Sequence, residues 1–99
     1  MKKNNMMREW VTRHIIVRGR VQGVGFRVFV RDVAVAFDIR GWVKNNPDGS
    51  LELVAHGIKE NFQSFVEQIE IGPPSSRVDQ VEVQTSEIDT SDSMFRIIA

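Results

Sequence analysis

A glycine-rich segment ending in an arginine is the part of this 99-residue sequence with the clearest capacity for chemistry. Residues 19–27 read Gly-Arg-Val-Gln-Gly-Val-Gly-Phe-Arg, and apolar residues recur at helical spacing from Phe26 onward. The first N–H groups of a helix have no partner within the helix and lie at the positive end of its dipole. Glycines ahead of the helix allow further N–H groups to turn toward a bound anion. The segment therefore predicts a site the size of a phosphate group.

Arg27 falls in the first turn of that helix, at the edge of its apolar stripe, so its side chain can stay beside the loop. A planar guanidinium can bind two phosphate oxygens and keeps its charge at any relevant pH. The pattern differs from the nucleotide-binding P-loop, because no Gly-Lys-Ser/Thr follows, and from the dinucleotide fingerprint, because the glycine spacing is different. From the residues alone, a tight strand-to-helix turn with a surface arginine remains an alternative.

A second candidate, Asn45, ends a predicted strand over residues 39–45 and precedes the turn Asn-Pro-Asp-Gly at residues 46–49. A carboxamide can accept one hydrogen bond from a water molecule and donate another, but it is not a strong base. Strand alternation places Asn45 on the same face as Val43 and opposite Lys44. By this pattern alone, Asn45 could equally be a turn former.

The elements that must position these residues follow the order strand, helix, strand, strand, helix, strand. Phe26, Val30, Val33 and Phe37 form one helical stripe, and a second stripe over residues 62–69 ends before Gly-Pro-Pro at 72–74. We predict strands over 10–18, 39–45, 50–56 and 78–85, a loop over 86–93, and a closing strand or docked tail over 95–98. The predicted fold class is α+β, a ferredoxin-like βαββαβ sandwich in which two helices cover one face of an antiparallel sheet.

Charge and composition narrow the range of functions. Lysine and arginine number 13 and so do aspartate and glutamate, which argues against general nucleic-acid binding. Ten of the basic and five of the acidic residues lie in residues 1–58, so an anion site is expected in that half. The absence of cysteine excludes disulfides and thiolate metal sites. The two histidines, His14 and His56, have no metal-ligand spacing, so we expect no metal and no cofactor.

The two segments resemble the sequence motifs of the acylphosphatase family. The first family motif, Gly-x-Val-Gln-Gly-Val-x-Phe-Arg, agrees with residues 19–27 at every specified position. The second, Gly-aromatic-x-x-Asn-x-x-Asp-Gly, agrees with residues 41–49, which read Gly-Trp-Val-Lys-Asn-Asn-Pro-Asp-Gly. The resemblance extends over roughly residues 13–98. Asp38 departs from it, because the family usually has a glycine there, and aspartate adopts left-handed backbone less readily.

The resemblance implies hydrolysis of acyl phosphates to a carboxylate and inorganic phosphate by direct attack of water. It implies that Arg27 supplies the essential charge and that Asn45 holds the attacking water, so these two are the expected catalytic residues. The residues expected to bind the substrate phosphate are Gln22, Gly23, Val24, Gly25, Phe26 and Arg27.

The expected partners are a small acyl phosphate as substrate and inorganic phosphate as product and competitor. We expect a metal-independent, monomeric hydrolase with no nucleic-acid or membrane partner. Residues 1–9 are predicted to be a flexible N-terminal extension of a domain over 10–99. The N-terminal segment lacks the apolar stretch of a secretory signal, which favours the cytoplasm. A non-catalytic module of the same fold that binds an anion or RNA is the alternative.

Overall fold

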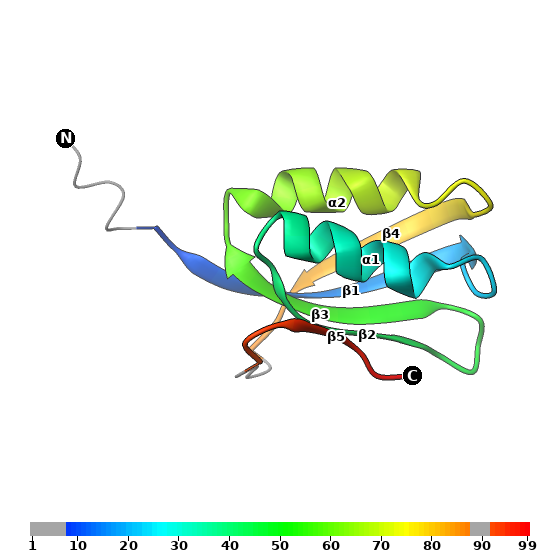
Figure 1. The fold of residues 1–99 in the computed structure, drawn as a ribbon, viewed down its shortest axis with the longest axis horizontal. Helices are drawn as coiled ribbons and strands as arrows, with labels where there is room; N and C mark the ends of the chain where they lie inside the picture. The colour runs from blue at the N-terminus through cyan, green and yellow to red at the C-terminus, as the bar shows by residue number, and fades with distance from the viewer. Residues whose placement is uncertain (1–7, 88–91) are drawn as a thin grey trace.

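The computed structural model describes residues 8–87 and 92–99. Within these ranges the elements are β1 (Trp10–Arg20), α1 (Phe26–Ala36), β2 (Arg40–Asn45), β3 (Leu51–Ile58), α2 (Asn61–Ile71), β4 (Arg77–Thr85) and β5 (Phe95–Ile97). Both helices lie on the same side of the sheet (Figure 1). The order predicted from the sequence is confirmed, and β1 and β3 each continue two residues beyond their predicted ends.

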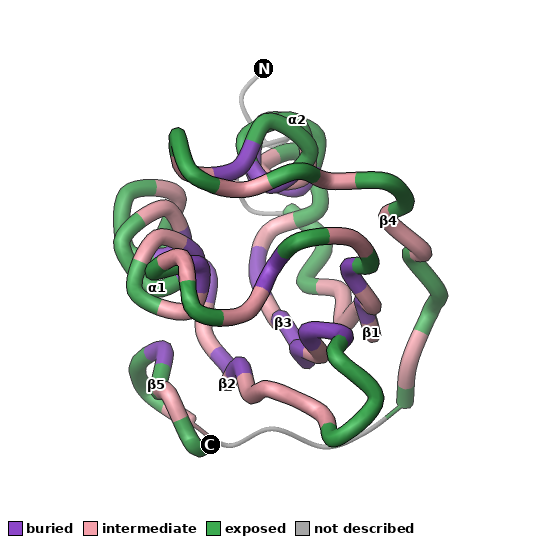
Figure 2. Tube along the Cα trace, turned by 90° about the vertical axis from the view of Figure 1, so that its right-hand side faces the viewer, coloured by how far each residue is buried: buried purple, intermediate pink, exposed green. Residues whose placement is uncertain are grey.

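The strands form one sheet in the order β4-β1-β3-β2-β5. The first four pair antiparallel, which confirms the ferredoxin-like arrangement. The fifth strand joins the far edge and runs parallel to β2, so the complete sheet is mixed. β4 and β5 therefore lie at opposite edges of the sheet, although they follow each other in the chain. Among the described residues, no helix or strand covers the face of the sheet away from the helices, here called the open face (Figure 2).

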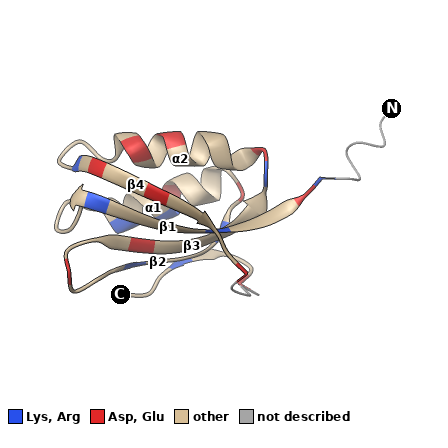
Figure 3. Ribbon diagram, turned by 180° about the vertical axis from the view of Figure 1, so that it is seen from behind, with Lys and Arg blue, Asp and Glu red and all other residues tan. Residues whose placement is uncertain are grey.

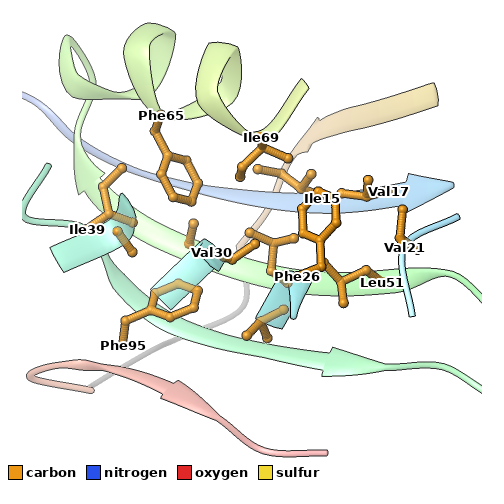
Figure 4. Packing of buried hydrophobic residues seen from close by; sticks show 14 of the residues in the cluster. Ile15, Val17, Val21, Phe26, Val30, Ile39, Leu51, Phe65, Ile69 and Phe95 are labelled. Carbon is orange, nitrogen blue, oxygen red and sulfur yellow. The ribbon is translucent and has the colours of Figure 1, made fainter. Parts of the chain in front are cut away.

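The core lies between the sheet and the two helices (Figure 4). On α1 the buried residues are Phe26, Val30 and Ala34, and on α2 they are Phe62, Phe65 and Ile69. Burying a large apolar side chain contributes roughly 1.5–3 kcal/mol. Phe26 is buried at the first position of α1, which fixes the start of that helix over the sheet. Arg27, the next residue along the chain, is therefore held at the same end of the molecule as the glycine-rich loop.

Two backbone positions depend on unusual dihedral angles. Gly19 has φ +133° at a bulge where β1 pairs with β4, and a Cβ there would collide with the carbonyl oxygen of Arg77. A larger residue would therefore separate the two strands just before the glycine-rich loop. Asp38, after the end of α1, has φ +55°, which costs a non-glycine residue about 1 kcal/mol.

The ends of the described ranges bear on two predictions. Of the extension predicted over residues 1–9, only Arg8 and Glu9 are described, and the Glu9 carbonyl accepts a hydrogen bond from the Lys59 N–H at 2.9 Å. The middle of the loop predicted over 86–93 lies outside the described residues. Neither α1 nor α2 has the length or the apolar content that a membrane-crossing helix needs, and no other described residues form a helix.

The charge difference between the two halves of the sequence is partly offset by the fold. Figure 3 looks onto the open face, with basic residues on β1 beside acidic residues on β4 and β3. Arg18 on β1 lies 3.1 Å from Glu82 on β4, joining the basic half to the acidic half. On this face, therefore, basic and acidic residues from the two halves of the sequence lie beside each other.

Candidate active site

The loop between β1 and α1 presents backbone donors that the protein does not use. Gly23 and Gly25 have φ values of +74° and +78°, left-handed conformations that glycine adopts at no steric cost. The Phe29 N–H donates to the Gly25 carbonyl at 3.1 Å, the first such bond of α1. In the described part of the chain, the N–H groups from Gly23 to Val28 donate to no protein acceptor. They are therefore available to an anion.

This loop forms one side of a pocket of about 180 Å³. Its other sides come from the end of β2, which lies at the same end of the molecule as the loop, and from β5 (Figure 1). The lining residues are Val21, Gly23, Gly25, Phe26, Arg27, Val28, Asn45 and Ile97. The fold thus brings the two sequence motifs to one cavity large enough for a phosphate group.

Arg27 provides the positive charge of the pocket. Its side chain is half-buried, and no carboxylate of the described residues lies within ion-pair distance of it. Arg18, in contrast, is paired with Glu82 and lies 3.6 Å from Asp48. Arg27 therefore lines the pocket with a guanidinium that forms no ion pair with another described residue.

Asn45 faces the loop from the last position of β2. Its backbone N–H donates to the Ala99 oxygen at 2.8 Å, which holds the end of β2 against the C-terminal segment. Its side-chain oxygen Oδ1 is buried and has no hydrogen-bond partner among the described residues. Leaving a buried acceptor without a partner costs about 1–3 kcal/mol, and such groups are few in folded proteins. Because Asn45 lines the pocket, a water molecule that enters there is the donor available to this acceptor.

Two hydrogen bonds join the glycine-rich loop to the turn after Asn45. The Gln22 side-chain amide donates to the carbonyl oxygens of Asn46 at 2.8 Å and Ser50 at 3.0 Å. Loop and turn are thus linked directly as well as through the sheet. This linkage fixes the distance between the N–H groups of the loop and the carboxamide of Asn45.

The turn over residues 46–50 is closed by its own polar groups. The Asp48 carboxylate accepts hydrogen bonds from the Ser50 hydroxyl at 2.6 Å and the Ser50 N–H at 2.9 Å. These bonds, with a smaller contribution from Arg18, hold the pKa of Asp48 below its ordinary value of 3.8. The Gly49 N–H donates to the Asn46 carbonyl at 3.1 Å, and Gly49 has a positive φ of +94°, as the turn motif predicts.

The structure separates the residues expected at the site into two groups. Gly23, Gly25, Phe26, Arg27 and Asn45 line the pocket. Gln22 and Val24 do not: the Gln22 side chain is bonded to the turn, and Val24 packs against the core. The sequence interpretation missed three apolar lining residues. The position of Val28 directly after Arg27 was a usable signal, whereas nothing local marked Val21 or Ile97.

The histidines lie outside this pocket, on the open face of the sheet. The His14 ring nitrogen Nε2 is 2.7 Å from Glu52, and the Thr12 hydroxyl is 2.8 Å from the His56 ring nitrogen Nδ1. The hydrogen bond to His14 lowers the pKa of Glu52. The positive charge of the Lys44 ammonium at 4.0 Å also lowers this pKa. One nitrogen of each ring is hydrogen-bonded to a neighbouring strand, and among the described residues no group of three metal-ligating side chains gathers.

The fold and pocket define a class of protein: a small α+β domain with a pocket where a glycine-rich loop enters a helix. Comparison with known proteins identifies the family to which the chain belongs. A family model described as Acylphosphatase matches residues 13–97. The acylphosphatase of Chlorobaculum tepidum is 47% identical over 85 residues, covering 86% of this chain and 92% of that protein. The chain therefore belongs to the acylphosphatase family of hydrolases.

Solved structures agree with this assignment. The crystal structure of acylphosphatase from Bacillus subtilis matches with a TM-score of 0.85 at 43% identity, covering 90% of this chain and 99% of that one. The structure of an acylphosphatase from Coxiella burnetii matches with a TM-score of 0.83 at 35% identity, covering 99% and 100%. The resemblance of the two motifs is confirmed at the level of the family and the fold.

Proposed function

We propose that this chain hydrolyses acyl phosphates to a carboxylate and inorganic phosphate by direct attack of water on phosphorus. The observation that carries this proposal is the meeting, in one pocket, of the unused N–H groups of the loop, the Arg27 guanidinium and the orphaned Oδ1 of Asn45. We further propose that the working unit is a monomer.

In this mechanism the loop and Arg27 bind the phosphoryl group. Backbone N–H donors in a fixed arrangement stabilise charge on its oxygens without reorganising during the reaction. The guanidinium adds a full positive charge and two parallel donors. Phosphoryl transfer is catalysed mainly by such positioning and charge stabilisation, so the pocket needs no nucleophilic side chain.

Asn45 orients the water in this mechanism. Oδ1 accepts a hydrogen bond from the water and directs an oxygen lone pair toward phosphorus. The leaving group is a carboxylate, whose conjugate acid has a pKa near about 4, so it departs without a general acid. The new P–O bond forms as the anhydride P–O bond breaks, and the water proton passes to a phosphate oxygen of the substrate.

The test is hydrolysis of benzoyl phosphate in 18O-labelled water, with the label measured in both products. Attack on phosphorus places one labelled oxygen in each inorganic phosphate and none in benzoate. Label in benzoate would show attack on the carbonyl carbon and contradict the mechanism. The same assay separates the enzyme from a non-catalytic anion-binding module, which would bind phosphate without releasing benzoate.

A further inference from the structure

The pocket has an apolar wall that binding of phosphate does not explain. Val28 from α1, Ile97 from β5 and the buried Val21 line it. Val28 is 46% exposed, so it offers an apolar side chain at the surface of the cavity. Nothing in the sequence alone had pointed to contacts for the acyl part of a substrate.

Val28 is separate from the core. Its neighbour Phe29 packs against the buried cluster, as do Val24 and Ile97, whereas Val28 does not. An apolar residue that lies outside the core cluster and is about half exposed is free to contact a ligand. Its removal should therefore affect binding far more than folding.

The polar side chains of the wall are already assigned by the proposed function. Among the described lining residues, Arg27 and Asn45 are the two with polar side chains. The first binds the phosphoryl oxygens and the second binds water, so neither is left to pair with a charged or hydrogen-bonding acyl group. A charged acyl group therefore gains no ion pair or hydrogen bond from the wall, whereas an apolar one gains apolar contact.

Resting on the proposed function, we propose that Val28 and Ile97 contact the acyl group and select its chemical class. The preferred substrates are acyl phosphates whose acyl part is uncharged and larger than acetyl, either aromatic or alkyl. The apolar group loses contact with water against the wall as the phosphoryl group enters the loop. Val28, the more exposed of the two, is the main specificity-determining residue.

The first experiment compares kcat/KM for benzoyl phosphate and acetyl phosphate in the wild type and in Val28→Thr, which keeps the shape of the side chain. The value for benzoyl phosphate should fall about threefold to tenfold, and that for acetyl phosphate less than about twofold. Comparing the two variant-to-wild-type ratios cancels the difference in intrinsic reactivity. The inhibition constant of inorganic phosphate should not change.

The matched control is Val35→Thr, two helical turns further along α1. Val35 is 67% exposed and outside the pocket, so this substitution should leave both substrates unaffected. Equal losses for both substrates in Val28→Thr, or no loss for either, would overturn the inference while leaving the hydrolytic function intact. Failure of the wild type to hydrolyse either substrate would instead overturn the proposed function.

A second pair of substrates tests the charge requirement without any substitution. Butanoyl phosphate and succinyl phosphate have acyl chains of the same length, but the second carries a carboxylate. The wild type should have the higher kcat/KM for butanoyl phosphate. A preference for succinyl phosphate would mean that the wall accepts a charged acyl group, which contradicts the assignment.

Discussion

The β1–α1 loop and the turn over residues 46–50 lie at the same end of the molecule. They differ in whether their polar groups form hydrogen bonds within the protein. In the turn, the Asp48 carboxylate, the Ser50 hydroxyl and the Gly49 N–H all bond within the turn. In the loop, the N–H groups from Gly23 to Val28 donate to no acceptor of the described residues. The closed turn is a rigid support, and the open loop is the binding surface in the proposed mechanism.

The two sequence motifs make different contributions to the pocket. The first motif supplies most of the lining of the pocket, and the second supplies Asn45 together with the residues that hold it in place. Glycine serves both motifs, but Gly25 frees backbone donors, whereas Gly41 allows a close approach to the Val54 carbonyl. The Gln22 side chain is hydrogen-bonded to the turn, so the closed turn restrains the motion of the open loop.

The largest effect is expected from Arg27→Lys in the open loop. Lysine retains the charge but loses the planar pair of donors, and kcat/KM for benzoyl phosphate should fall at least about a thousandfold. The matched control is Arg31→Lys, one turn further along α1, where the exposed side chain lies 3.6 Å from Asp32. The control should keep its activity. Near-normal turnover by Arg27→Lys would mean that charge alone suffices.

Asn45→Ala tests whether the motif containing the turn contributes to chemistry or only to structure. Removing the carboxamide should lower kcat about a hundredfold to a thousandfold, because the water loses its orientation. Binding of inorganic phosphate, measured by calorimetry, should stay within about threefold, because the loop and Arg27 are unchanged. A parallel loss of phosphate binding would contradict the division between the two regions.

Gln22→Met breaks the connection between the regions while preserving side-chain size. Two hydrogen bonds to carbonyl oxygens disappear, which should lower the free energy of unfolding by about 1–2 kcal/mol. We expect kcat/KM to fall about tenfold, because the loop is no longer fixed relative to Asn45. Gln63→Met, at an exposed site on α2, is the control for the substitution itself. Unchanged kinetics in Gln22→Met would show that the loop is rigid without the turn.

The smallest effect concerns the pH dependence of the closed turn. Because the pKa of Asp48 is lower in the folded chain, the carboxylate stabilises the fold above its ordinary value of 3.8, and this contribution is lost as the pH falls through the folded pKa. Thermal unfolding of the wild type and Asp48→Ala should therefore differ most near neutral pH and converge in acid. A difference that persists in strong acid would mean that the aspartate acts without its charge.

Local patterns predicted much of this molecule because the relevant groups are close in the chain. The helical stripe from Phe26, the glycines before it and Arg27 predict the anion site within nine residues. The turn at 46–49 likewise contains its own hydrogen bonds. The strand-and-helix order followed from the same short-range periodicities.

Pairings between distant segments were beyond such patterns. The parallel pairing of β5 with β2, the contacts of the Gln22 side chain and the place of Ile97 in the pocket each join residues from separate elements. A residue's own neighbours determine whether it favours a helix, strand or turn, and so the sequence by itself determined the elements and the two motifs. Only the tertiary structure decided that Val28 and Ile97 face the same cavity as Arg27 and Asn45, because packing the whole core sets how the elements meet.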